Sequence, residues 1–228
     1  MSNHFAVAID GPAGAGKSTV AKRVAQALNA IYLDTGAMYR AVGLYMLRHE
    51  IPLDDAAGIA KSAPDAKVDV RYVDGAQRVF LCGEDVSEAI RENPVSAAAS
   101  AVSAVPQVRT LLVARQREIA AGTSVVMDGR DIGTKVLPDA PVKVFLTAAA
   151  EVRAQRRFLE LQKKGQPVPY EQLLAEIKQR DFNDSTRAAS PMVQAADAVL
   201  LDSSDMTIDQ VVQAIVALAR ERTGEAGA

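Results

Sequence analysis

Short hydrophobic runs alternate with longer amphipathic segments along most of the chain. Residues 5–9 and 30–33 are short and apolar, and each run is followed by a helical pattern. Further runs of the same kind lie at residues 124–127, 141–146 and 198–201. Such runs are typical of buried strands in a parallel sheet. The alternation predicts an α/β fold with a five-stranded parallel sheet and helices on both faces.

The helical segments carry their apolar residues on one face. In residues 18–28, Val20, Val24 and Leu28 follow the helical period. The last helix opens with a capping-box pattern, in which Thr207 is followed three residues later by Gln210. The residues of this helix that we expect to face inward are Ile208, Val211, Val212, Ile215 and Leu218.

The alternation of short apolar runs and helical segments is interrupted between residues 51 and 92. Residues 68–73 alternate between apolar and polar, Asp74-Gly75 marks a turn, and the alternation resumes at residues 78–82. This pattern predicts a β-hairpin. Residues 84–87 are expected to lead into further helix. Because an antiparallel hairpin does not fit inside a parallel sheet, we expect it in an inserted subdomain.

Composition limits the classes of partner. The 228 residues include 26 basic and 28 acidic side chains, a net charge of −2, so no global basic field favours nucleic acid. One cysteine and two histidines exclude an intrachain disulfide and make a Cys/His zinc site implausible. The chain has no signal pattern and no apolar run long enough to span a membrane. We therefore expect a cytoplasmic protein without a membrane partner, and a monomer because no exposed apolar stripe is left over.

The first strand leads directly into the sequence G-x-x-x-x-G-K-S, the phosphate-binding P-loop. Its glycines allow close backbone approach, and its backbone N–H groups and the following helix N-terminus attract phosphate. Lys17 adds a charge against the β- and γ-phosphates, and Ser18 offers a hydroxyl to Mg²⁺. The expected ATP-binding residues are Gly11, Pro12, Ala13, Gly14, Ala15, Gly16, Lys17, Ser18 and Thr19.

Polar residues also follow two other predicted strands, at the sheet edge where ligands bind in α/β folds. Asp128-Gly129-Arg130-Asp131 follows residues 124–127 in the Walker-B manner, and Asp128 could hold Mg²⁺ directly or through water. The alternative is a turn closed by an internal Asp/Arg pair. Thr35 follows residues 30–33 and is either a helix N-cap or a ligand. Nearby Arg40 could reach a phosphate or be an ordinary surface arginine.

Charged residues cluster on two later helices. Arg153, Arg156 and Arg157 are spaced so that they share a face, which favours a bound anion over a solvated face paired with Glu151 and Glu160. In the next helix one stripe begins apolar and turns charged, which indicates that it leaves the core and enters a cleft. Its members are Leu173, Ile177, Arg180, Asp184 and Arg187. A simple Arg180–Asp184 pair is the alternative.

A P-loop indicates nucleotide binding but leaves hydrolysis, phosphoryl transfer and passive binding open. No guanine-reading N-K-x-D motif occurs. The scattered arginines favour a second, anionic substrate. A kinase for a small metabolite would need Asp34 or Asp131 as a base for a hydroxyl acceptor, and a non-catalytic ATP-binding module would need no lid arginines.

Four stretches together resemble bacterial cytidylate kinases, within the P-loop nucleoside monophosphate kinases. They are G-P-A-G-A-G-K-S-T from Gly11, D-T-G-A-M-Y-R from Asp34, D-G-R-D-I-G-T from Asp128 and I-K-Q-R-D from Ile177. The resemblance implies transfer of a phosphoryl group from ATP to CMP or dCMP with Mg²⁺. It leaves a kinase for UMP or AMP as a rival, since few side chains set base specificity.

The resemblance also implies domains and residue roles. The core would comprise residues 1–34, 122–150 and 168–228, the monophosphate-binding domain residues 35–121 with an insertion near 62–92, and the lid residues 151–167. Catalytic roles would belong to Lys17, Arg130, Asp131, Arg153 and Arg157, with the lid arginines over the transferring phosphoryl group. The CMP phosphate would bind Arg40, Arg109, Arg130 and Arg187. Cytosine and ribose would be read by Ser100, Arg180 and Asp184, with Thr35, Tyr39 and Asp131 close to the nucleotide.

Overall fold

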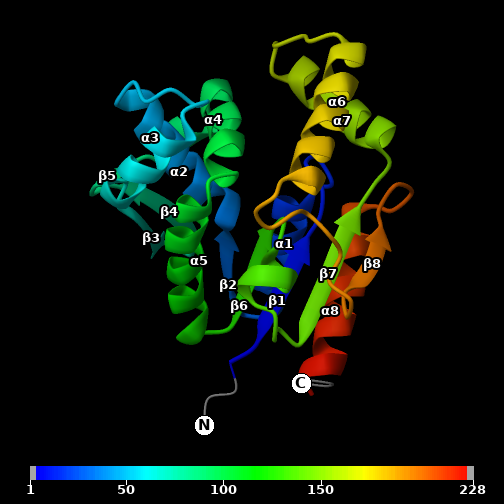
Figure 1. The fold of residues 1–228 in the computed structure, drawn as a ribbon. Coiled ribbons are helices and arrows are strands. Elements are labelled where there is room, and N and C mark those ends of the chain that lie inside the picture. Colours follow the sequence, from blue (N-terminus) through cyan, green and yellow to red (C-terminus); the bar gives the residue numbers. More distant parts are fainter. Residues whose placement is uncertain (1–3, 225–228) are drawn as a thin grey trace. The chain divides into compact units, whose positions relative to one another are not determined.

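The computed structural model describes residues 4–224, and the chain forms two compact units (Figure 1). The first unit holds the described residues 4–30 and 124–224, and the second holds residues 31–123. The parallel sheet has five strands in the order β2-β6-β1-β7-β8, and a separate sheet has the order β3-β4-β5. The expected α/β class is confirmed. The predicted domain limits, including a lid at 151–167, stay a prediction.

The first unit contributes four parallel strands: β1 (Ala6–Asp10), β6 (Val125–Gly129), β7 (Val142–Thr147) and β8 (Val199–Asp202). β1 lies between β6 and β7, with Val7 opposite both Val126 and Val142. All five residues of β6 are buried, as expected for a strand covered on both faces. β8 is an edge strand, and its Leu200 is 56% exposed. Most residues of β1, β6 and β7, in contrast, are buried.

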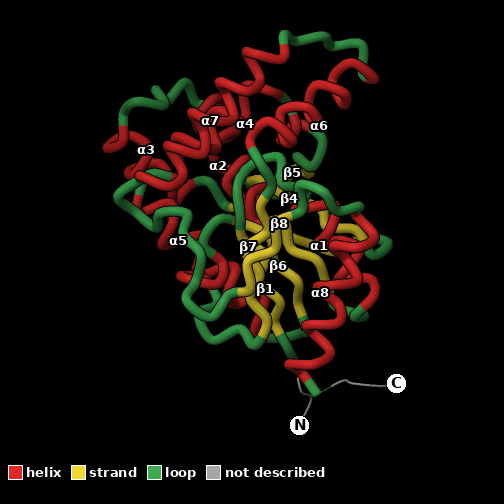
Figure 2. The backbone as a smooth tube through the Cα atoms, turned by 90° about the vertical axis from the view of Figure 1, so that its right-hand side faces the viewer, coloured by secondary structure: helices red, strands yellow, loops and turns green. Residues whose placement is uncertain are grey.

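Two helices cover one face of these strands. α1 (Lys17–Ala27) packs on β6 and on α8 (Ile208–Thr223), which Figure 2 shows alongside it. Val20, Val24 and Leu28 are buried as predicted. The capping box of α8 is confirmed, but the inward placement of Ile208 is wrong, because this first residue of the helix is 49% exposed. A π-helical turn, η3 (Ile132–Val136), packs on β1 and β6 and was not predicted.

A helical pair completes the first unit. α6 (Ala150–Lys163) and α7 (Tyr170–Thr186) pack on each other, and the rings of Phe158 and Tyr170 meet edge to face at 6.3 Å. Gly165, with a φ of 68°, lies just after the end of α6 and turns the chain away from the helix. Figure 1 shows the two helices as a hairpin.

The second unit begins with β2 (Ile31–Asp34) and α2 (Thr35–Arg48). The remaining helices are α3 (Ala56–Ser62), η1 (Ala63–Asp65), η2 (Ala89–Arg91), α4 (Asn93–Ser103) and α5 (Pro106–Ala121). Gly43 of α2 lets α4 approach closely, since a Cβ there would lie 2.9 Å from the backbone nitrogen of Ala99.

The predicted hairpin is confirmed. β3 (Val68–Val73) and β4 (Ala76–Leu81) are antiparallel, and Asp74 and Gly75 both have positive φ, at 52° and 73°, as a tight hairpin turn requires. Residues 84–87 lead into helix as expected, first η2 and then α4. Glu84 and Asp85 also form β5, a two-residue strand paired with β4 that the sequence did not predict.

Among the described residues, no single helix has the length and apolarity to cross a membrane. Only α4 and α5 taken together would meet that test by length and composition, and they are bent by 100° at the break between them.

Candidate functional site

The phosphate-binding loop joins the end of β1 to the start of α1. Gly11 has a φ of 144°, and a Cβ there would lie 2.0 Å from the carbonyl oxygen of Leu146, so only glycine fits. Gly16, with a φ of 84°, is the N-cap of α1 and has no side chain with which to cap it. The first N–H groups of the helix are therefore oriented for an anion.

Lys17 and Ser18 begin α1 and point to different partners. The Lys17 side chain is buried, and its Nζ donates a hydrogen bond of 2.7 Å to the carbonyl oxygen of Pro12. Burial, followed by the positive charge of Arg130, lowers the pKa of Lys17 from 10.5 to about 7. The charge of Arg180 acts in the same direction. The carboxylates of Asp128 and Asp10 act in the opposite direction, so charges of both signs surround the Lys17 ammonium.

The hydroxyl of Ser18 donates a hydrogen bond of 2.9 Å to Oδ2 of Asp128, near the end of β6. Both predicted metal ligands are therefore adjacent, and both offer the hard oxygen atoms that Mg²⁺ prefers. No group of three or more Asp, Glu, His or Cys side chains within residues 4–224 could hold a metal ion alone. These two oxygens fit a Mg²⁺ ion that takes its remaining ligands from water and nucleotide phosphates.

Two arginines and two aspartates form a compact charged cluster. The Nε of Arg130 donates to Oδ2 of Asp184 at 2.9 Å. Arg187 lies 3.8 Å from Asp184 and 3.9 Å from Asp131. All four side chains are mostly or fully buried, at 20% exposure or less. The structure therefore brings together these predicted residues from the end of β6 and from α7.

The predicted stripe of α7 is in part as expected, since Leu173 is buried on its apolar part and Asp184 on its charged part, whereas Arg187 lies just past the helix as its C-cap. That the stripe enters a cleft stays a prediction. The alternative, a simple Arg180–Asp184 pair, does not account for Asp184. Its carboxylate accepts a hydrogen bond from Arg130, which lies 54 residues earlier in the chain.

The three arginines of α6 do not act as one cationic face. Arg153 is buried and donates to the carbonyl oxygen of Ala13 in the phosphate loop at 2.9 Å. Arg156 donates to the carbonyl oxygen of Ser203 at 2.6 Å, whereas Arg157 is half-buried and pairs with Glu160 at 2.9 Å. The helical spacing aligns their Cβ atoms, but the long side chains diverge to different neighbours.

The second unit holds the other predicted residues, and α2 carries three of them. The N-cap of α2 is Asp34, whose Oδ1 accepts from the backbone nitrogen of Ala37, so Thr35 is not the cap but the buried first residue of the helix. Oδ2 of Asp34 accepts from Arg40 at 2.7 Å. Both carboxylate oxygens are therefore engaged, which does not favour Asp34 as a general base.

Tyr39 and Arg109 lie together within the second unit. The guanidinium carbon of Arg109 is 5.4 Å from the centre of the Tyr39 ring, a cation–π contact between α2 and α5. Arg109 also donates to the carbonyl oxygen of Ser103 at 3.2 Å. Ser100 is half-buried on α4. These contacts fix the ring of Tyr39 and the guanidinium of Arg109 against each other.

A model of the family "Cytidylate kinase" matches residues 7–221 of the chain. The chain belongs to the cytidylate kinase family. A cytidylate kinase from Caldicellulosiruptor bescii is 53% identical over 212 residues, which cover 93% of this chain and 94% of the relative. Cytidylate kinases from Mycolicibacterium paratuberculosis and Desulforamulus reducens are 53% and 54% identical, and the matches cover 98% and 95% of this chain and 98% and 97% of the relatives.

A solved structure supports the fold independently. An uncharacterized protein from Eubacterium ventriosum matches with a TM-score of 0.51 at 18% identity, over 96% of this chain and 99% of that one. Membership of the cytidylate kinase family confirms the resemblance that the four sequence stretches predict.

Two acidic residues of this cytidylate kinase chain contact predicted site segments but were not predicted. Asp10, at the end of β1, accepts hydrogen bonds of 2.8 Å from the backbone nitrogens of Ile132 and Gly133. Burial raises the pKa of Asp10 from 3.8 to about 6. Asp181 accepts from Arg153 at 2.6 Å. Asp10 carries the same signal as Asp128, an aspartate after an apolar strand, and could have been found by it.

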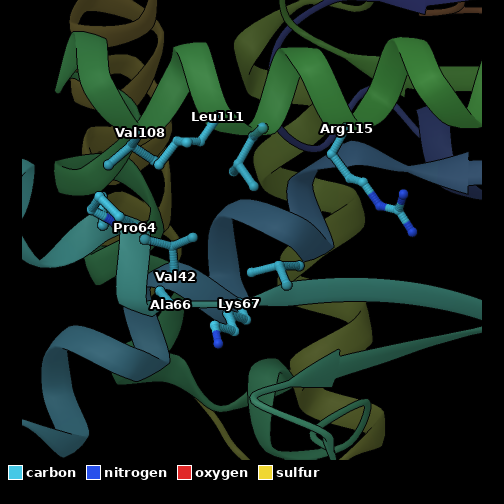
Figure 3. Close-up of a pocket in the computed structure, with 10 residues that line it drawn as sticks. Val42, Pro64, Ala66, Lys67, Val108, Leu111 and Arg115 are labelled. Atoms are coloured by element: carbon cyan, nitrogen blue, oxygen red, sulfur yellow. The ribbon is translucent and has the colours of Figure 1, made fainter.

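The second unit of this cytidylate kinase chain also contains a pocket of about 170 Å³ (Figure 3). It lies between α2, η1, β3 and α5, and its lining is largely apolar, with Val42, Val108 and Leu112 among its walls. Lys67 and Arg115 are its charged members. No predicted site residue lines it, so this pocket is separate from the predicted nucleotide-binding residues.

Proposed function

We propose that the chain transfers the γ-phosphoryl group of ATP to CMP or dCMP and releases ADP with CDP or dCDP. The family match over residues 7–221 supports this reaction. The observation that carries the chemistry is Lys17 at the start of α1 together with Arg130 and Arg187, which both contact Asp184. Such a group of cations suits two phosphate-bearing substrates.

The acceptor atom in this reaction is an oxygen of the CMP phosphate. That oxygen is already anionic near neutral pH, so the reaction needs no strong general base. Alignment of the substrates and neutralisation of charge supply the catalysis. Lys17 and the N-terminus of α1 stabilise the donor phosphates, while Arg130 and Arg187 hold the acceptor phosphate.

Mg²⁺ is proposed to bind at Ser18 and Asp128, whose oxygens lie 2.9 Å apart. When bound, the ion neutralises charge on the β- and γ-phosphates of ATP. The hydroxyl of Ser18 is the natural direct ligand, since a serine or threonine at this position holds Mg²⁺ in other P-loop proteins.

The family resemblance assigns acceptor-binding residues to each unit. In the first unit, Arg180 and Asp184 read the nucleoside and Asp131 lies close to it. Arg130 and Arg187 both contact Asp184 in this structure. If the dianionic phosphate of the acceptor attracts these arginines, the Asp184 carboxylate becomes available to accept hydrogen bonds from hydroxyl or amino groups of the acceptor. In the second unit, Arg40 and Arg109 would contact the phosphate, Ser100 would read cytosine and ribose, and Thr35 and Tyr39 would lie close to the nucleotide.

The half-buried side chain of Arg157 is proposed to reach the transferring phosphoryl group when nucleotides bind. Its present partner, Glu160, lies on the same helix, so the pair is weak and easily exchanged. Exclusion of water by a closing segment would limit wasteful ATP hydrolysis. A cytoplasmic location and a monomeric state stay predictions.

The test is ADP formation from ATP and Mg²⁺ with CMP, dCMP, UMP, AMP or GMP, each against a blank without acceptor. Fastest turnover with CMP and dCMP is expected. Equal rates with UMP would overturn the base specificity, and ATP binding without acceptor-dependent turnover would favour a non-catalytic module. Lys17→Met should lower turnover by about 100-fold or more. Lys61→Met, at an exposed position on α3, is the matched control and should not.

A further inference from the structure

Arg153 contacts three separate segments of the first unit. Its Nε donates to the carbonyl oxygen of Ala148 at 2.8 Å, just before α6. One terminal nitrogen donates to the carbonyl oxygen of Ala13 at 2.9 Å, and the other donates to Oδ2 of Asp181 at 2.6 Å. Only 4% of Arg153 is exposed. A single guanidinium therefore joins the phosphate-binding loop, α6 and α7.

The contact with Ala13 fixes the orientation of one peptide unit of the phosphate-binding loop. In a planar trans peptide, the C=O and the following N–H point in opposite directions. By holding the oxygen of Ala13, Arg153 turns the N–H of Gly14 away from itself. Gly14 also packs against the stem of Arg153, since a Cβ on Gly14 would lie 3.3 Å from the Cβ of the arginine.

The contact with Asp181 fixes a position on α7. Asp181 follows Arg180 directly and precedes Asp184 by one turn, and both neighbours belong to the proposed acceptor site. Oδ1 of Asp181 is buried and has no hydrogen-bond partner within the described part of the chain. The carboxylate therefore depends on Arg153, and a buried carboxylate that loses its partner is costly.

We propose that Arg153 is a positioning residue that couples the phosphate-binding loop to α7, so that the donor and acceptor nucleotides favour each other's binding. The guanidinium is planar and its N–H groups have fixed directions. A shift of the loop on ATP binding is therefore transmitted through Arg153 to Asp181 and to the residues beside it. The coupling is reciprocal, and values of about 5- to 150-fold are typical of such links. This inference rests on the proposed function.

The test compares the Kd of CMP, measured by calorimetry, with and without a non-hydrolysable ATP analogue and Mg²⁺. In the wild type the analogue should tighten CMP binding by about tenfold. Asp181→Asn should reduce that ratio to below about twofold, and Asp181→Glu, which keeps the charge, should restore part of it. An unchanged ratio in Asp181→Asn, or no coupling in the wild type, would overturn the proposal.

Lys178→Met is the matched control. Lys178 of α7 pairs with Glu151 of α6 at 3.0 Å, so this ion pair joins the same helices, but both side chains are exposed. The control should keep the wild-type ratio. If it loses the ratio as Asp181→Asn does, general packing of α6 on α7 explains the coupling and the role of Arg153 is refuted.

Hydrogen–deuterium exchange in the nucleotide-free protein separates this inference from the proposed function. Asp181→Asn should increase exchange of the backbone amides of residues 11–18, and Lys178→Met should not. Unchanged exchange in Asp181→Asn would overturn the link to the loop whatever the acceptor is. If instead the wild type does not phosphorylate CMP but exchange responds as expected, the proposed function fails and the link stands.

Discussion

Replacing Asp10 by asparagine should change how the free energy of unfolding depends on pH. Asp10 is 5% exposed, and its carboxylate accepts hydrogen bonds from the backbone nitrogens of Ile132 and Gly133. Burial is the largest cause that raises its pKa, the two hydrogen bonds lower it, and the charge of Asp131 raises it further. The result is a pKa of about 6 in the folded protein against 3.8 for an ordinary aspartate.

The sign and size follow from the difference between those two values. Between about pH 4 and pH 6 the folded state holds a proton on Asp10 that the unfolded state has released. The stabilisation is therefore complete below the pKa of 3.8 and is lost as the pH rises through about 6. A difference of about 2 pKa units corresponds to about 3 kcal/mol. Asp10→Asn cannot titrate, so it should gain up to about 3 kcal/mol relative to the wild type across this range.

The assay is urea unfolding followed by circular dichroism at several pH values from about 4 to about 7, with linear extrapolation to water. The wild-type and variant free energies should converge or cross as the pH rises. Asp205→Asn, at an exposed position, controls for the loss of a carboxylate from the surface. A difference between Asp10→Asn and the wild type that stays constant with pH would refute the reasoning.

Three further predictions follow from local geometry. Gly11→Ala should destabilise the protein by about 3 kcal/mol or more in urea unfolding, since its Cβ would lie 2.0 Å from a carbonyl oxygen at a φ of 144°; normal stability would contradict the placement of this loop. Thr207→Ala should cost about 1 kcal/mol, because it removes the capping box of α8; a change below the error of the measurement would show that the cap contributes nothing. Arg187→Ala should lower kcat/KM for CMP by about 100-fold or more, and an unchanged value in the steady-state assay would remove Arg187 from the site.

Local sequence patterns predicted those elements whose signals are themselves local. The glycines of the loop at residues 11–18, the turn at Asp74-Gly75 and the capping box at Thr207 each demand one backbone geometry, and the structure has it. The charged end of the α7 stripe was predicted because a helical period places Asp184 on the same face as Leu173.

The features that were missed depend on contacts between distant segments. The π-helical turn Ile132–Val136 begins where Asp10 accepts two backbone N–H groups from 122 and 123 residues away. The two-residue strand Glu84–Asp85 is too short to show a period and forms only because β4 lies beside it. Arg153 has the same spacing signal as Arg157, yet Arg153 is buried against the phosphate-binding loop and Arg157 is half-buried and pairs with Glu160.

The central claim is that the acceptor is a nucleotide phosphate. A rapid-quench single turnover with ATP labelled in its γ-phosphoryl group, in the presence of Mg²⁺ and CMP, tests it most directly. The label should move into the β-phosphate of CDP, and little label should be released when CMP is omitted. Label that appears only as inorganic phosphate, at a rate independent of CMP, would contradict it.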